Sequence, residues 1–131
     1  MQKLKGGEVI ELISDLGGGK TTFVHGIARG AGSNDKVASP TFTVSKVYKS
    51  PVLAIHHFDF YRLPEAGLME HEIVDVLDDP TNVIIVEWGA VVVHVLPENR
   101  LTVSINHLDN DKREFIFEYP DHLSYLVEDI C

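Results

Sequence analysis

A glycine-rich loop constrains the fold of this chain more than any other feature of its sequence. The segment SDLGGGKTTF, Ser14–Phe23, follows the phosphate-binding pattern G-x-x-x-x-G-K-[ST] from its sixth position onward and departs from it only at the first, where Ser14 replaces glycine. The pattern indicates a nucleotide site only when a strand precedes the loop and a helix follows it. EVIELI, Glu8–Ile13, has the short aliphatic run of a buried strand, and KTTFVHGIARG has helical spacing from Lys20 to Gly30. Both flanks are therefore predicted.

The residues of this loop have the chemistry that a phosphate site needs. Its glycines leave backbone N–H groups open to phosphate oxygens, and the N-terminus of the following helix adds a favourable dipole. Lys20 is predicted to reach the outer phosphates, and the Thr21 hydroxyl to coordinate Mg²⁺. The alternative is a glycine-rich turn in which GKT occurs by chance. The predicted phosphate-binding run is Asp15, Leu16, Gly17, Gly18, Gly19, Lys20, Thr21 and Thr22.

Two carboxylates near predicted strand ends are candidates for the metal and for hydrolysis. Glu87 follows the aliphatic run Val83–Val86, and Asp59 follows Val52–Ile55 less directly. Sites for Mg-nucleotides use carboxylates that a hydrophobic strand delivers to the phosphates. Either acid can instead be an ordinary surface residue. Trp88, the single tryptophan, is better interpreted from sequence alone as a core residue than as a base-stacking one.

The seven histidines show no spacing typical of metal ligands. His71-Glu72 lacks the second histidine of H-E-x-x-H, and His56-His57 lacks partners in the sequence. The histidines are interpreted as scattered surface or strand residues, and no zinc site is predicted.

The remaining segments predict more antiparallel strand than a simple doubly wound sheet contains. SPTFTVSKVYK and VLAIHHFDFYRL predict a hairpin, and NVIIVEWG predicts the most strongly buried strand. NRLTVSINHLDNDKREFIFEY predicts a second hairpin with its turn at Asp109–Asp111, a helix is predicted to begin near Pro64, and DHLSYLVEDI predicts a short helix. We therefore predict one domain over residues 1–131, of the α/β class. Its core is a P-loop NTPase-like mixed sheet, parallel in the centre with antiparallel strands added, and helices flank it.

Charge and composition restrict the class of partner and the compartment. Residues 1–63 carry 8 Lys and Arg against 5 Asp and Glu (+3), whereas residues 64–131 carry 3 against 15 (−12). Because nucleic-acid affinity derives largely from neutralising phosphates, this balance disfavours direct, autonomous binding of RNA or DNA. The single cysteine, Cys131, excludes an internal disulfide and favours a reducing cytoplasm. No apolar run approaches the roughly 20 residues of a membrane span, and no signal peptide is recognisable.

Five motifs, in order and spacing, resemble the bacterial TsaE (YjeE) family. The resemblance covers nearly the whole chain from Gly7 onward, and the H-x-D-x-Y-R-L block is uncommon elsewhere. The motifs are DLGGGKTTF, SPTFT (Ser39–Thr43), HFDFYRL (His57–Leu63), VEW (Val86–Trp88) and LPENRL (Leu96–Leu101).

The resemblance implies a P-loop domain with weak Mg-dependent ATPase activity. Such a protein binds ATP or ADP with Mg²⁺ and supports the TsaB–TsaD heterodimer in forming threonylcarbamoyladenosine at position 37 of tRNA, while TsaD performs the transfer. In this chain, Thr41 matches a switch-type threonine near the metal, Asp59 the metal-side acid and Glu87 the acid that orients the attacking water. Trp88 lies beside the site and joins the nucleotide-binding residues. The implied catalytic residues are Lys20, Asp59 and Glu87, and the implied metal ligands are Thr21, Thr41, Asp59 and Glu87.

The sequence also departs from the family pattern and leaves alternatives open. Members begin the loop with glycine where this chain has Ser14, and they carry a helix before the first strand that is missing here. One alternative is a nucleotide-dependent scaffold that hydrolyses little ATP. Another is a small-molecule P-loop kinase, although such kinases need an arginine-bearing lid, and Arg62, Arg100 and Arg113 form no cluster in the sequence.

Overall fold

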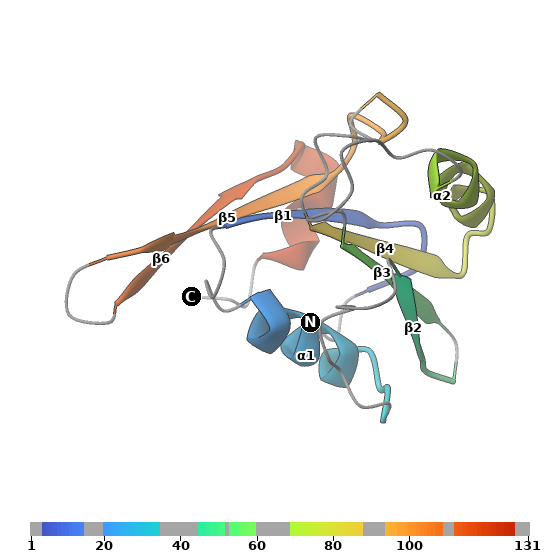
Figure 1. Cartoon of the computed structure of the whole chain (residues 1–131), viewed down its shortest axis with the longest axis horizontal. Helices are drawn as coiled ribbons and strands as arrows, with labels where there is room; N and C mark the ends of the chain where they lie inside the picture. The colour runs from blue at the N-terminus through green and yellow to red at the C-terminus, as the bar shows by residue number, and fades with distance from the viewer. Residues whose placement is uncertain are drawn as a thin grey trace.

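The computed structural model describes residues 4–14, 20–34, 45–51, 53–59, 69–87, 94–108 and 112–127. In these ranges, no helix is long and apolar enough to cross a membrane. The elements are β1 (Val9–Ser14), α1 (Lys20–Gly30), β2 (Ser45–Lys49), β3 (Ala54–Asp59), α2 (Met69–Leu77), β4 (Asn82–Glu87), β5 (Leu101–His107), β6 (Arg113–Glu118) and the 3₁₀ helix η3 (Asp121–Leu126) (Figure 1).

The strands form one mixed sheet in the order β2-β3-β4-β1-β5-β6. The four central strands β3, β4, β1 and β5 run parallel. The outermost strands β2 and β6 each pair antiparallel with their single neighbour. The predicted parallel core and both predicted hairpins are confirmed. Because the carboxyl ends of parallel strands meet at one edge, the segments that follow β1, β3 and β4 all start from the same edge of the sheet.

Alternating side chains of the strands build a core on each face of the sheet. On one face, Val24 and Ile27 of α1 pack with Ile85 of β4, and η3 adds Leu123 and Leu126 to the same cluster. On the other face, α2 contributes Ile73, which packs with Phe58 and Ile84. Figure 1 shows α1 and α2 on opposite sides of the sheet. The predicted mixed sheet flanked by helices is thus confirmed.

The two helices predicted near Pro64 and in DHLSYLVEDI correspond to α2 and η3. Within the described residues α2 begins at Met69, and the predicted start near Pro64 lies outside them. The short helix expected in DHLSYLVEDI is a 3₁₀ helix over Asp121–Leu126. A 3₁₀ helix has three residues per turn, so Leu123 and Leu126 lie on the same side and are both buried. The turn Asp109–Asp111 lies outside the described residues.

A buried glutamate connects the start of the described chain to η3. Glu8 is 4% exposed and accepts hydrogen bonds from the backbone N–H groups of Lys5 (2.8 Å) and Gly6 (2.7 Å). It also accepts one from the Tyr125 hydroxyl at 2.7 Å. Burial, and then the bond to Glu8, raise the pKa of the Tyr125 phenol, so this hydroxyl stays protonated and remains a donor.

Gly6 is expected to tolerate no side chain. Its φ is +101°, and a Cβ there would lie 2.0 Å from the carbonyl oxygen of Pro80. Gly7 is a matched control, because its φ of +84° is also left-handed but a Cβ would meet nothing within 4 Å. We expect Gly7→Ala to lower the free energy of unfolding by about 1–2 kcal/mol, and Gly6→Ala by about 1–3 kcal/mol more, measured by urea denaturation. Equal losses would show that the backbone near Pro80 yields freely.

Candidate functional site

The sheet brings the two predicted acids to the same edge, beside the strand that leads into the glycine loop. Asp59 is the last residue of β3 and Glu87 the last residue of β4, and the two are opposite each other in the parallel register. On its other side, Glu87 is opposite Leu12 of β1. The chain leaves β1 two positions after Leu12, at Ser14, where the predicted phosphate loop starts.

Both acids lie on the face of the sheet that α1 covers. Alternation along β3 places Asp59 on the same side as Ile55, and alternation along β4 places Glu87 on the same side as Ile85. Ile55 and Ile85 belong to the core cluster that contains Val24 of α1. The carboxylates therefore occupy the end of the face bearing the helix that follows the glycine loop. Carboxylate oxygens are the donors that Mg²⁺ prefers, and one or two of them with phosphate oxygens suffice, so the pair fits the implied metal.

Glu87 is buried and held by a hydrogen-bonded chain of side chains. The residue is 2% exposed, and its Oε2 contacts Nε2 of His57, which is fully buried at 0%. On the other side of the imidazole, Nδ1 lies 3.2 Å from the hydroxyl of Tyr48, which is 1% exposed. The three residues come from β2, β3 and β4, so the chain crosses three neighbouring strands on one face.

The structure corrects the interpretation of His57 as a scattered surface or strand residue without partners. Its strand assignment is right, but the ring lies in the core between Tyr48 and Glu87. The overlooked signal is period-two alternation, since His57 lies midway between buried Ile55 and the candidate acid Asp59 on one face. His56, on the opposite face, is half-buried and hydrogen-bonds to Asn82 Oδ1 at 3.1 Å.

The other predicted site residues are placed only in part. Lys20 and Thr21 are the first residues of α1, directly after the loop, and Thr22 is exposed in its first turn. Asp59 is half-buried. Among the side chains that the structure describes, no group of three or more His, Cys, Asp or Glu could hold a metal ion. The predicted residues outside the described ranges are Asp15, Leu16, Gly17, Gly18, Gly19, Thr41 and Trp88.

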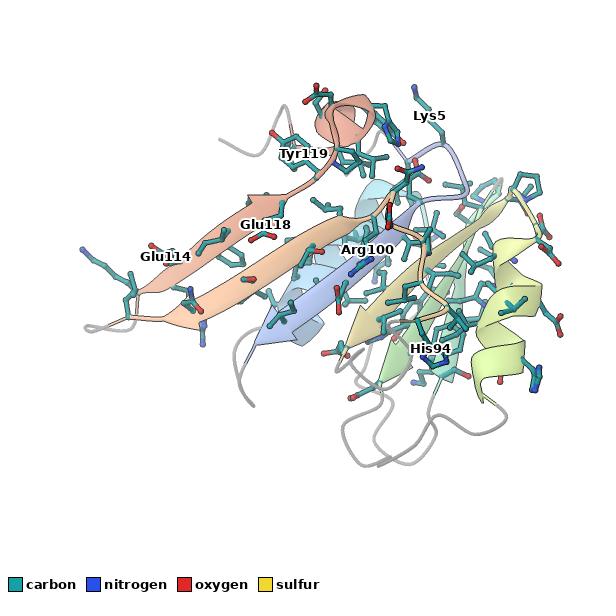
Figure 2. The ribbon with its side chains drawn as sticks, turned by 90° about the horizontal axis from the view of Figure 1, so that it is seen from above. Lys5, His94, Arg100, Glu114, Glu118 and Tyr119 are labelled. Carbon is teal, nitrogen blue, oxygen red and sulfur yellow. The ribbon has the colours of Figure 1, made fainter. Side chains whose placement is uncertain are left out.

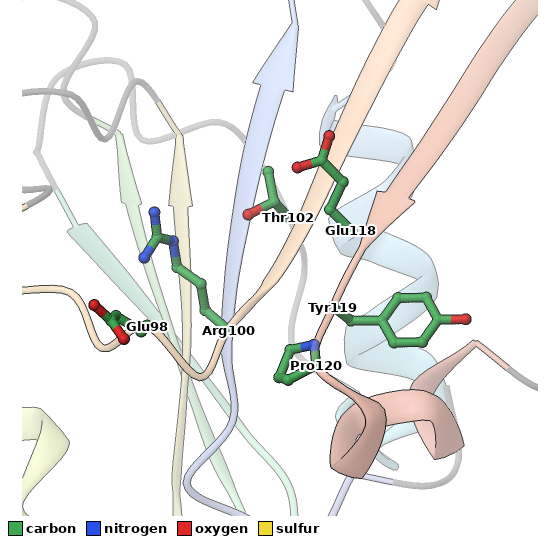
Figure 3. Close-up of a pocket in the computed structure, with 6 residues that line it drawn as sticks. All are labelled: Glu98, Arg100, Thr102, Glu118, Tyr119 and Pro120. Carbon is green, nitrogen blue, oxygen red and sulfur yellow. The ribbon is translucent and has the colours of Figure 1, made fainter.

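A separate hollow lies at the opposite end of the sheet and does not coincide with this site. It has a volume of about 380 Å³, and Figure 3 shows the side chains around it. Arg100 at its rim donates from Nε to Glu11 Oε1 at 3.1 Å and from Nη1 to the Pro97 carbonyl at 2.9 Å. In Figure 2, Tyr119 lies beside η3, and Glu118 lies between Tyr119 and Glu114 along β6. The lining residues are Glu98, Arg100, Thr102, Glu118, Tyr119 and Pro120.

Comparison with known proteins gives one consistent relationship. A family model described as "Threonylcarbamoyl adenosine biosynthesis protein TsaE" matches residues 1–115. The tRNA threonylcarbamoyladenosine biosynthesis protein TsaE of Bacillus subtilis is 42% identical over 113 residues, covering 86% of this chain and 70% of that protein. The protein of the same description from Rickettsia prowazekii is 34% identical over 128 residues, covering 90% of this chain and 87% of that protein.

A solved structure agrees with the sequence matches. The crystal structure of Bacillus subtilis YdiB superposes with a TM-score of 0.76 at 34% sequence identity. The superposition covers 98% of this chain and 80% of that one. The similarity therefore includes the whole mixed sheet and the helices on its two faces.

Proposed function

The chain belongs to the TsaE family of threonylcarbamoyl adenosine biosynthesis proteins, and we propose that it is an ATP-binding subunit with weak Mg-dependent ATPase activity. In this proposal it supports a TsaB–TsaD heterodimer in forming threonylcarbamoyladenosine at position 37 of tRNA, and it acts in the cytoplasm. The observation that carries the proposal is the register at one edge of the sheet, where Asp59, Glu87 and Leu12 of β1 lie in adjacent strands.

The glycine loop and the start of α1 would hold the nucleotide. Backbone N–H groups of residues 15–19 would donate hydrogen bonds to the phosphate oxygens, with Lys20 supplying the positive charge and Thr21 a hydroxyl ligand for the metal. Mg²⁺, when bound with ATP, neutralises charge on the β- and γ-phosphates. Asp59 and Glu87 would face it from β3 and β4, because both end at the edge from which the loop starts.

Glu87 would orient the water that attacks the γ-phosphate. Its Oε2 is held by His57, and the whole residue is almost fully buried. A carboxylate whose orientation is fixed in this way can accept a proton or a hydrogen bond from a water held at one place, as positioning of a nucleophile requires. Asp59, half-buried on the neighbouring strand, would serve the metal side.

A nucleotide-dependent scaffold that hydrolyses little ATP is the second candidate. The burial of Glu87 against His57 supports it, because such a carboxylate can also serve the packing of the core. The small-molecule kinase is less favoured, since Arg100 is engaged with Glu11 and Pro97 on the opposite face of the sheet.

Reconstituted tRNA modification tests the proposed function. Formation of threonylcarbamoyladenosine by TsaB–TsaD would be followed over several turnovers with and without this protein. Parallel reactions would contain ATP or a non-hydrolysable ATP analogue. We expect repeated turnover only when this protein and ATP are both present. Equal support by the analogue would favour the scaffold, and no dependence on this protein would contradict the proposal.

The isolated protein is expected not to bind tRNA at physiological salt. Residues 64–131 carry 3 Lys and Arg against 15 Asp and Glu, so contacts with phosphates would be repulsive over much of the surface. A gel-shift titration to micromolar protein, without TsaB–TsaD, measures this. A salt-sensitive shifted band would reveal a basic surface that the overall charge conceals.

A further inference from the structure

We propose that His57 is a positioning residue for Glu87 and that Tyr48 fixes the orientation of the His57 ring. The inference rests on the proposed function, because the action of Glu87 on water belongs to that function. It adds two residues that touch neither nucleotide nor water and act through the Glu87 carboxylate.

With the carboxylate ionised and the ring neutral, one arrangement of protons satisfies all three side chains. An ionised carboxylate only accepts hydrogen bonds, so Nε2 of His57 must carry a proton and donate it to Glu87 Oε2. In a neutral ring, Nδ1 then has a free lone pair, and the Tyr48 hydroxyl donates to it at 3.2 Å. The carboxylate thus sets the ring tautomer, and the bond from the Tyr48 hydroxyl satisfies Nδ1 and holds the ring in this orientation.

The sheet register fixes where this chain of bonds ends. His57 is opposite Ile85 and Asp59 is opposite Glu87, so the His57 ring reaches diagonally forward from β3 to the last residue of β4. Tyr48, on the edge strand β2, is opposite Ile55 of β3 and reaches the His57 ring from the other side. The chain thus ends at the edge where the glycine loop starts, and it orients Oε2 of the acid beside that edge.

Burial limits the partners that the polar atoms of these three side chains can have. His57, Tyr48 and Glu87 are exposed by only 0%, 1% and 2%. Without His57, the Glu87 carboxylate would lose a donor in surroundings that solvate a charge poorly, so it would rotate toward another partner. Aliphatic residues such as Ile55 and Ile85 pack the same face without polar atoms, so burial alone does not require a histidine here. A role in directing Glu87 explains why polar groups occupy these three positions.

Substitutions at His57 separate positioning from packing. His57→Leu fills the space without a donor, whereas the side-chain amide of His57→Gln can donate to Glu87 in place of Nε2. With TsaB–TsaD present, we expect His57→Leu to lower turnover of ATP by about 10- to 100-fold, the usual effect of losing such a supporting group. His57→Gln should restore most of it, and Tyr48→Phe should lie between. ATP affinity should stay within a few-fold of the parent in all three.

His56→Leu is the matched control, because His56 is the adjacent histidine on the other face of the sheet and its side chain hydrogen-bonds to Asn82 rather than to Glu87 or Tyr48. We expect its turnover to equal that of the parent. In a Glu87→Gln background, His57→Leu should cause no further loss, since it acts through the carboxylate that is already gone. A further loss of the same size would indicate packing and would overturn the inference.

The histidine ring also gives a readout that does not depend on turnover. In ¹⁵N-labelled protein, we expect His57 to carry its proton on Nε2, with the proton resonance shifted strongly downfield and displaced by Glu87→Gln. Protonation of Nδ1 alone would overturn the inference.

A parent protein that releases no phosphate would overturn the proposed function and this inference together. Parent-like turnover in His57→Leu, with an active parent, would overturn this inference alone.

Discussion

Lys20→Ala is expected to abolish ATP turnover and to weaken ATP binding by about 10- to 100-fold. Lys20 is the first residue of α1 and directly follows the glycine loop. It is thus the side chain predicted to carry positive charge to the outer phosphates. A charge-assisted hydrogen bond contributes about 1.5–3 kcal/mol, which corresponds to that loss of affinity. Isothermal titration with ATP and Mg²⁺, together with phosphate release, measures both effects.

Lys46→Ala is the control for net charge. Lys46 is exposed on the edge strand β2, so its removal changes the charge of the protein equally without touching the loop. We expect parent affinity and turnover from Lys46→Ala. If Lys20→Ala binds ATP as tightly as the parent, the assignment of the loop as a phosphate site is wrong.

Glu87→Gln is expected to lower turnover with TsaB–TsaD by about 100-fold or more, while ATP affinity stays within a few-fold of the parent. Glutamine keeps the shape of the side chain, and its amide oxygen can still accept a hydrogen bond from His57. The substitution therefore removes the negative charge that orients water but leaves the loop's own contacts intact. Single-turnover phosphate release and nucleotide titration separate the two effects.

The roles of the two acids can be distinguished by a parallel variant. Asp59→Asn, on the neighbouring strand, should lower the affinity for Mg²⁺ more than Glu87→Gln does, so that a higher Mg²⁺ concentration is needed for half-maximal turnover. Glu72→Gln, at an exposed position of α2, serves as the control and should behave as the parent. If turnover survives Glu87→Gln and disappears in Asp59→Asn, the two roles are reversed.

Local pattern was sufficient to predict the elements whose burial is continuous or periodic. β4 is the clearest case. Val83–Val86 form an uninterrupted aliphatic run in the sequence, and each of these side chains is at most 1% exposed in the structure. α1 follows from the helical spacing of Phe23, Ile27 and Gly30, with Val24 and Ala28 beside them. Of these, Val24, Ile27 and Ala28 are buried in the core. The adjacency of Asp59 and Glu87 is a consequence of strand order, which no local pattern in the sequence specifies.

Contacts between distant side chains could not be predicted from the sequence. Glu87 meets His57 across 30 positions, Arg100 meets Glu11 across 89, and Tyr125 meets Glu8 across 117. Each pair depends on which strands are neighbours and on their register, and a shift by one residue would turn every side chain to the other face. Alternation along a strand predicts which face of the sheet a histidine lies on, but not which acid on another strand it contacts.

Phosphate release from ATP by the purified protein, alone and with TsaB–TsaD, tests most directly whether this chain is an ATPase that supports the modification of tRNA. We expect slow, Mg²⁺-dependent release by the protein alone, because a single P-loop domain without an added arginine hydrolyses slowly. Release should rise several-fold with TsaB–TsaD and should be lost in Lys20→Ala under both conditions. Release that is absent with and without TsaB–TsaD, or that persists unchanged in Lys20→Ala, would contradict the proposed function.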